Sequence, residues 1–139
     1  MIEETFSSSG ACTGATTTNG ATATYDPDGR TGGACKLCAA SSGEAYLELS
    51  GTAPKQGQAT FEVHARRVPG ASTPASATVQ VAVGGTKITS SNGISETWKR
   101  VGGPSLTVQS GAAVVFRVGM KEAASGDCVV LDDARVALP

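Results

Sequence analysis

The sequence has 139 residues, of which 40% are hydrophobic, 17% charged and 4% aromatic, and its formal net charge at pH 7 is −1. This length predicts a single domain, residues 1–139, and the near-neutral charge excludes the basic surface with which proteins bind nucleic acid. The apolar stretches, such as residues 112–116 and 128–131, are far shorter than the roughly 20 residues of a membrane-spanning helix, so we expect no membrane span. The first residues lack the positive start and apolar middle of a signal peptide.

Apolar and polar residues alternate with a period of two along most of the chain, a pattern that predicts β-strands and no long helix. Strands are expected, in chain order, at residues 2–6, 20–25, 34–40, 45–50, 60–67, 77–83, 97–101, 106–109, 114–120 and 128–138. The alternation is clearest in residues 60–67, where Phe61, Val63 and Ala65 are expected in the core.

Turn residues separate these segments, among them the Asn-Gly and Gly-Gly pairs at 19–20 and 84–85. Eight to ten short strands at this spacing predict an all-β fold, an antiparallel β-sandwich of the jelly-roll type. We expect the loop of residues 68–75, which contains Pro69, Gly70 and Pro74, to be the most mobile segment.

The four cysteines, Cys12, Cys35, Cys38 and Cys128, form an even set in a small chain whose core is built mostly from Ala and Val. Two disulfides would stabilise such a core, whereas a zinc site at Cys35 and Cys38 lacks a second close pair. If residues 34–40 form a strand, Cys35 and Cys38 face opposite ways, and each pairs with Cys12 or Cys128. Disulfides predict a location outside the cytoplasm.

The sequence contains no recognisable set of catalytic residues. The chain has one histidine, His64, and no Gly-x-Ser-x-Gly motif that would place a nucleophilic serine beside a base. Glu48 and Glu62 could form a carboxylate pair for glycoside hydrolysis, but nothing in the sequence fixes their separation, and solvated strand faces are the better explanation for them. We therefore expect no enzymatic activity.

Acidic residues occur near both chain ends, at Glu3 and Glu4 and at Asp132 and Asp133. Calcium takes six to eight oxygen ligands, and carboxylates on two neighbouring strands together with loop carbonyls can supply them. The alternative is that these acids are exposed charges at strand ends.

Several segments resemble known sequences. The ending Val-Val-Leu-Asp-Asp-Ala-Arg-Val at residues 129–136 resembles the last strand of jelly-roll carbohydrate-binding modules of the galactose-binding-like superfamily. Residues 57–63, 79–85 and 97–101 resemble further strands of these modules in the same order, and residues 2–6 resemble their acidic first strand. The resemblance implies that Asp132 and Glu3 or Glu4 hold a structural calcium ion.

Such modules bind sugars through aromatic rings, which stack on the sugar, and planar polar groups, which bind its hydroxyls. We expect one such surface on a concave sheet face and another at a rim that brings Trp98 together with Tyr25. The residues expected on the sheet face are Tyr46, Glu48, Glu62, His64, Arg66, Gln80 and Arg117.

The resulting hypothesis is a non-catalytic carbohydrate-binding module that docks a polysaccharide for an attached domain of a larger, secreted bacterial protein. The alternative is a structural or adhesive module of an extracellular assembly, which the low aromatic content and abundant Thr, Ser and Ala favour.

Overall fold

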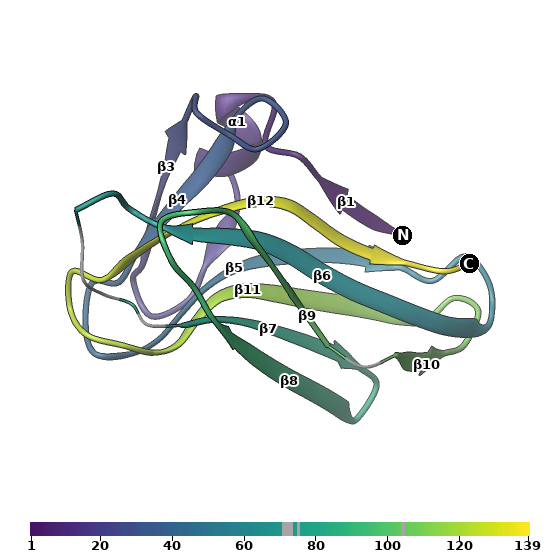
Figure 1. The fold of residues 1–139 in the computed structure, drawn as a ribbon. Helices are drawn as coiled ribbons and strands as arrows, with labels where there is room; N and C mark the ends of the chain where they lie inside the picture. The colour runs from purple at the N-terminus through teal and green to yellow at the C-terminus, as the bar shows by residue number, and fades with distance from the viewer. Residues whose placement is uncertain (71–73, 75, 104) are drawn as a thin grey trace.

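A computed structural model describes residues 1–70, 74, 76–103 and 105–139. Most of the loop expected to be mobile, residues 71–73 and 75, lies outside the described residues. Over the described residues the chain forms two antiparallel sheets that pack face to face (Figure 1). The fold class predicted from the sequence, an all-β sandwich, is confirmed.

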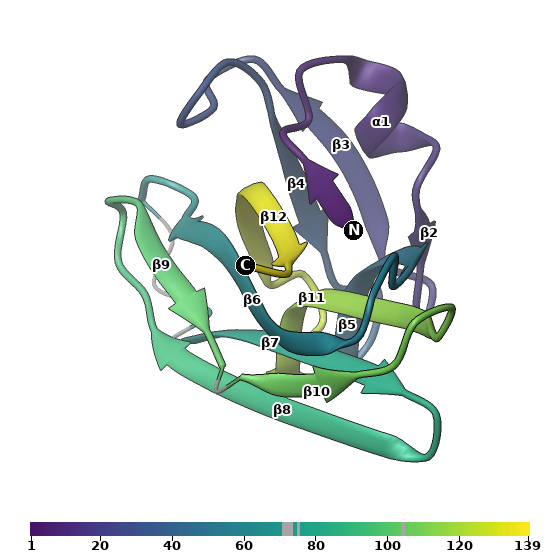
Figure 2. The same ribbon diagram turned by 90° about the vertical axis from the view of Figure 1, so that its right-hand side faces the viewer.

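The first sheet, called the β12 sheet after its central strand, has the order β10-β6-β12-β4-β3, with β1 also paired to β12 and β9 also paired to β6. Its strands are β1 (Ile2–Glu4), β3 (Thr22–Asp26), β4 (Ala34–Cys38), β6 (Gly57–Arg67), β9 (Lys99–Gly102), β10 (Leu106–Val108) and β12 (Cys128–Ala137). Strands β4 and β1 pair with successive halves of β12, and Figure 2 shows β1 beside β12.

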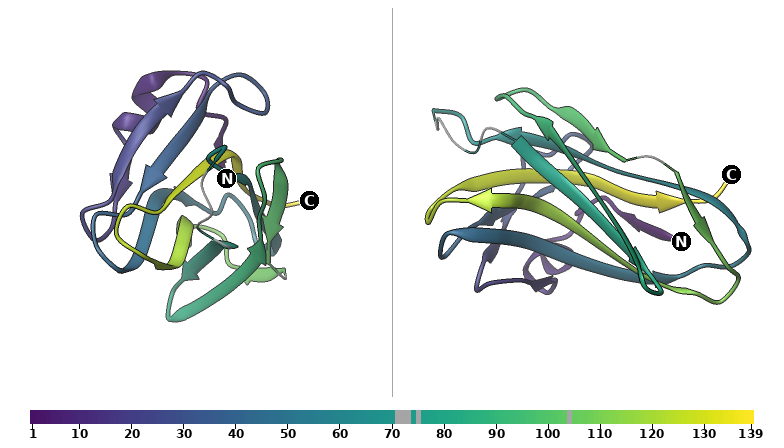
Figure 3. Two further views of the ribbon diagram at one scale, coloured as in Figure 1. Left: turned by 60° about the vertical axis from the view of Figure 1, so that its left-hand side comes forward. Right: turned by 90° about the horizontal axis from the view of Figure 1, so that it is seen from below.

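The second sheet, called the β11 sheet, has the order β2-β5-β11-β7-β8. Its strands are β2 (Thr16–Thr17), β5 (Gly43–Thr52), β7 (Ser76–Val83), β8 (Thr86–Gly93) and β11 (Ala113–Ala123). The two layers are seen from two further directions in Figure 3.

The core lies between the sheets and follows the alternation of the strands. Phe61 of β6 and Phe116 of β11 meet edge to face with ring centroids 6.2 Å apart, and both are fully buried. Val63 and Ala65 are buried in the same core, as the sequence predicts. The outward residues of each strand remain available to form the surface.

All ten expected strands are present, with ends that shift by a few residues. Three elements were not expected: β8, β2 and the short helix α1 (Ser9–Thr13), which begins after Ser8 and packs against β3 and β4. The hairpin of β7 and β8 turns at the Gly84-Gly85 pair, where Gly84 has a φ of 60°.

Both disulfides are present, and the prediction that Cys35 and Cys38 bond to different partners is confirmed. Cys12 of α1 bonds to Cys35 of β4, and Cys38 of β4 bonds to Cys128 of β12. Since no free cysteine remains, the zinc alternative is excluded.

Candidate functional site

The outer face of the β12 sheet is shaped by a β-bulge in β12. The register between β12 and β6 shifts between Asp132 and Arg135, and Asp133 has a φ of 49°. Leu131 and Ala134 face the core on either side of the bulge, so Asp132 and Asp133 both project outward. The bulge therefore places two adjacent carboxylates on one face.

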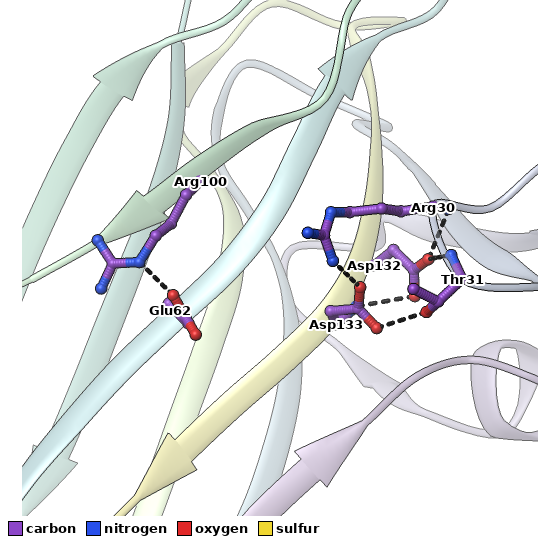
Figure 4. A network of polar contacts seen from close by, with 6 residues as sticks. All are labelled: Arg30, Thr31, Glu62, Arg100, Asp132 and Asp133. Atoms are coloured by element: carbon purple, nitrogen blue, oxygen red, sulfur yellow. Dashed lines mark hydrogen bonds and ion pairs between the residues drawn. The ribbon is translucent and has the colours of Figure 1, made fainter.

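These carboxylates hold the loop between β3 and β4 against β12. One oxygen of Asp132, Oδ2, accepts hydrogen bonds from the backbone N–H groups of Arg30 at 2.8 Å and Thr31 at 3.2 Å. Its Oδ1 accepts the N–H of Asp133 at 2.7 Å. Asp133 in turn pairs with the Arg30 guanidinium at 2.8 Å and accepts a hydrogen bond from the Thr31 hydroxyl (Figure 4).

The Asp132 carboxylate is fully buried. Burial raises its pKa because it disfavours the charged form, while the hydrogen bonds from Thr31, Asp133 and Arg30 act in the opposite direction. Asp132 is thus a buried acceptor for three backbone N–H groups, two of which fix the position of the β3–β4 loop.

A cleft with a volume of about 360 Å³, called the His64 cleft, opens on this face. It is lined by residues of β1, the β3–β4 loop, β6 and β12, namely Glu3, Thr5, Arg30, Thr31, Glu62, His64, Asp133, Ala134 and Arg135. Glu62 of β6 forms an ion pair with Arg100 of β9. Figure 4 shows this pair on the left and the pair of Arg30 and Asp133 on the right.

His64 lies between these ion pairs without a hydrogen bond. Its Nδ1 is sealed from solvent and has no partner among the described residues. The pKa of His64 is lowered, first by burial and then by the positive charge of Arg30, and Glu62 and Asp133 only partly oppose this. The imidazole is therefore neutral at neutral pH.

Trp98 lies on the same face, farther along β6. The guanidinium of Arg66 lies 5.0 Å from the centroid of the Trp98 ring, and it also pairs with Asp26 at 3.4 Å and donates to the carbonyl of Asp28 at 3.3 Å. Trp98 is half-buried. Its ring therefore covers a cation that is already fixed by the end of β3.

The expected rim with Trp98 beside Tyr25 is wrong. Tyr25 precedes Asp26 in β3 and so projects to the opposite side of the strand, where it packs against the core and lies close to Gly33. Strand alternation separates the two rings.

The outer face of the β11 sheet carries a row of polar side chains that crosses four strands. Arg117 of β11 lies between Glu48 of β5 and Gln80 of β7, and Gln80 lies opposite Thr89 of β8. The Arg117 Nε is 2.9 Å from Glu48 Oε2, and Gln80 donates to the Thr89 hydroxyl at 3.3 Å. These contacts hold the planar groups in fixed orientations.

A depression of about 170 Å³, called the Gln80 groove, lies beside this row. It is lined by Gln80, Ala82, Lys87, Val115 and Arg117, so that Ala82 and Val115 add an apolar patch.

The single concave surface expected from the sequence is divided between two sheets. Glu62, His64 and Arg66 project from β6 in the β12 sheet, whereas Gln80 and Arg117 project from the opposite side of the sandwich. Alternation predicts which residues face outward but not which sheet a strand joins.

By the same division, Glu48 and Glu62 lie on the outer faces of different sheets. They therefore cannot flank one glycosidic bond as a catalytic pair.

Tyr46 is fully buried, so the expectation that its ring is open for stacking on a sugar is wrong. Its hydroxyl has no hydrogen-bond partner among the described residues. Burial, and secondly the charge of Glu44, raises the pKa of Tyr46 to about 12.

We expect Tyr46→Phe to raise the free energy of unfolding by about 1 kcal/mol, because it removes a buried hydroxyl without a partner. The folded protein keeps the Tyr46 proton up to a pH of about 12, while the unfolded chain loses it from about pH 10. The free energy of unfolding of the wild type therefore falls as the pH rises from about 10 to about 12. In the Tyr46→Phe variant, which has no hydroxyl to titrate at this position, it should fall less. Urea unfolding at pH 7 and at alkaline pH measures both effects, and a destabilised variant would contradict them.

Several solved structures that this chain resembles are carbohydrate-binding modules. The CBM22-1 xylan-binding domain of Paenibacillus barcinonensis Xyn10C aligns with a TM-score of 0.73 at 12% identity, over 99% of this chain and 92% of that one. A family 35 carbohydrate-binding module from Clostridium thermocellum aligns with a TM-score of 0.66 at 17% identity, over 99% and 98%. The CBM22-1-GH10 modules of Clostridium thermocellum xylanase 10B, complexed with xylohexaose, align with a TM-score of 0.71 at 11% identity, over 99% and 28%.

The chain has the jelly-roll fold of carbohydrate-binding modules. At these identities the likeness shows the fold alone. No protein-family model matches the sequence, and neither does any curated protein. Within the described part of the chain, no helix has the length and apolarity needed to cross a membrane.

The residues that the resemblance assigned to calcium lie on the neighbouring strands β1 and β12. Strand β1 pairs with β12 as expected, yet Glu3 and Glu4 alternate to opposite sides of β1, and Glu4 accepts the N–H of Phe6 at 2.8 Å. The oxygens of Asp132 already face N–H donors. Within residues 1–70, 74, 76–103 and 105–139 no cluster of three or more acidic, histidine or cysteine side chains could hold a metal. Calcium binding stays a prediction.

No sequence motif singles out Arg30, Thr31 or Arg135 as site residues. Arg30 and Thr31 belong to a Gly-rich turn, and only the fold shows that this turn lies over β12, about a hundred residues away in the chain. Arg135 becomes a cleft residue because the bulge turns it outward.

Proposed function

We propose that this protein is a non-catalytic carbohydrate-binding module that docks a polysaccharide across the outer face of the β11 sheet. The observation that carries the proposal is the polar row of Glu48, Arg117, Gln80 and Thr89, which crosses four neighbouring strands beside the Gln80 groove. A linear ligand laid along this row would meet the exposed Thr89 and the partly exposed Arg117 and Glu48. Gln80 is only 7% exposed, and a ligand would reach it at the wall of the Gln80 groove.

The chemistry of the row suits sugar hydroxyls. Arg117 and Glu48 are each about 30% exposed, with side-chain values of 31% and 28%, so both can reach a ligand while their ion pair fixes them. Guanidinium, carboxylate and amide groups offer several donors and acceptors in one plane. Ala82 and Val115 would contact the C–H groups of a sugar ring.

Among the described residues this face offers no aromatic ring to a ligand, since Tyr46 of β5 is fully buried. Binding would therefore depend on hydrogen bonds to groups that are already oriented, which limits the entropy lost on binding. A chain of several sugar units would be favoured over a single unit, because each contact is weak and the row is extended.

The structural neighbours support a polysaccharide of neutral sugars as ligand, since one is a xylan-binding domain and another was solved with xylohexaose. The second of these is joined to a GH10 module, which supports the role of a docking domain for an attached catalytic domain. The two disulfides support secretion.

We expect the double variant Gln80→Ala/Arg117→Ala to bind xylan at least about tenfold more weakly than the wild type, because two oriented groups of the row are lost. Affinity electrophoresis in gels containing xylan, mixed-linkage glucan or galactan measures this. Lys121→Ala is the matched control, since it removes an exposed positive charge from the same strand.

Equal binding by the folded double variant would move the docking site away from the β11 sheet. If the folded wild type binds none of these polysaccharides, nor insoluble cellulose or chitin, the structural or adhesive module becomes the better description.

A further inference from the structure

We propose that the His64 cleft is a second, independent binding site, which takes a single neutral sugar unit or a similar small polyol. It lies on the β12 sheet, on the opposite side of the sandwich from the Gln80 groove, and its residues take no part in the proposed docking row.

The cleft is large enough and its walls are fixed. Its volume of about 360 Å³ falls in the range of small-molecule sites, which begins at roughly 300 Å³. On one side of the cleft, Arg30 is bound by Asp132 through its backbone N–H and by Asp133 through its guanidinium. On the other side, Glu62 is paired with Arg100. A ligand would therefore meet groups that are already in place.

His64 supplies a group that the protein itself does not use. Neither of its ring nitrogens has a hydrogen-bond partner among the described residues. Because Nδ1 is sealed from solvent, Nε2 is the nitrogen that can meet a ligand in the cleft. In a neutral imidazole Nε2 is a donor in one tautomer and an acceptor in the other, and a hydroxyl group complements either.

The charges of the cleft favour a neutral ligand. Arg30 is balanced by Asp133 and Glu62 by Arg100, while Glu3 and Arg135 are direct cross-strand neighbours of opposite sign. Among the described residues of the cleft, counted together with Arg100, negative and positive side chains are equal in number, so the cleft favours neither an anion nor a cation. Paired carboxylates and guanidinium groups still offer acceptors and donors, which is what the hydroxyls of a sugar need.

The β3–β4 loop, bound to Asp132 and Asp133, forms one wall of the cleft. The described lining residues include no Phe, Tyr or Trp side chain on which successive units of a sugar chain could stack. Beyond this loop the face is occupied by Arg66 with Trp98 over it. This arrangement suits one terminal sugar unit, in contrast to the extended row on the β11 sheet.

Nuclear magnetic resonance can test the proposal directly, since His64 is the only histidine in the chain. We expect its imidazole signals to shift saturably when xylose, arabinose, galactose or glucose is titrated into the wild-type protein at constant neutral pH. Arg135→Ala, which truncates an exposed cleft residue, should weaken this response about tenfold or more. His64→Leu should abolish binding as measured by calorimetry.

The double variant Gln80→Ala/Arg117→Ala is the control, and it should retain the full response of His64. Unmoved His64 signals with all four sugars would overturn the proposal. So would a response that glucuronic acid alone produces, because that requires an anion site, or a response that the control variant loses. Loss of xylan binding in the control variant with an intact His64 response would support two separate sites.

Discussion

Removing the disulfide between Cys38 and Cys128 by the double variant Cys38→Ala/Cys128→Ala is expected to lower the free energy of unfolding by about 4 to 5 kcal/mol. The bond joins positions 90 residues apart, and the entropy that such a link removes from the unfolded chain grows with the length of the loop it closes. Small domains have total stabilities of roughly 5 to 15 kcal/mol, so this loss alone brings the protein close to unfolding.

The pair Cys12→Ala/Cys35→Ala provides the comparison. Its loop spans 23 residues, so the expected loss is smaller, about 3 kcal/mol. Urea unfolding of the two double variants measures both values, and alkylation followed by mass spectrometry checks that each retains its other disulfide. An equal or reversed order would contradict the loop-closure explanation, and four alkylated thiols in the wild type would contradict both disulfides.

Asp132→Ala is expected to destabilise the fold by about 3 kcal/mol or more. The substitution leaves the N–H groups of Arg30, Thr31 and Asp133 without their carboxylate acceptor, and it removes a side chain that is fully buried. Asp132→Asn should cost less, because the amide keeps one acceptor oxygen and removes the charge whose burial raises the pKa of this carboxyl group.

Asp133→Asn is the control for the neighbouring position, because asparagine tolerates the positive φ of this residue. The Asp133 side chain is 19% exposed and pairs with an exposed arginine, so losing its charge should cost less than about 1 kcal/mol. Unfolding curves in urea measure all three variants, and equal losses at the two positions would contradict the role assigned to Asp132.

Urea unfolding curves of the wild type with calcium and with a chelator test calcium binding, since a bound ion would raise the unfolding midpoint by mass action.

Most of the fold follows from local patterns in the sequence. Alternation places the core residues of β5, β6, β7 and β11 because each of these strands has one buried face. Strand β8 escapes this logic, since its sequence Thr-Lys-Ile-Thr-Ser-Ser-Asn-Gly is mostly polar and it lies at the edge of the β11 sheet, where little apolar surface is buried.

The candidate sites are less predictable because they depend on contacts between distant segments. The sequence identifies Glu62, His64, Gln80 and Arg117 as outward residues, yet only the strand order assigns them to opposite sides of the sandwich. Tyr46 alternates as an outward residue but is covered, so its burial depends on its neighbours in space.

The arrangement of the two disulfides has a mechanical consequence. Strands β1 and β12 are antiparallel neighbours, so the first and last residues lie at the same end of the sandwich (Figure 1). A force that pulls the two chain ends apart would separate β1 from β12 until the chain is extended as far as Cys12 and Cys128. From there the force would be carried by covalent bonds alone. This covalent path runs from Cys12 through β4, between Cys35 and Cys38, to Cys128. Residues 13–34 and 39–127 lie outside it, so the strands of the β11 sheet, which carry the proposed docking row, would bear no tension.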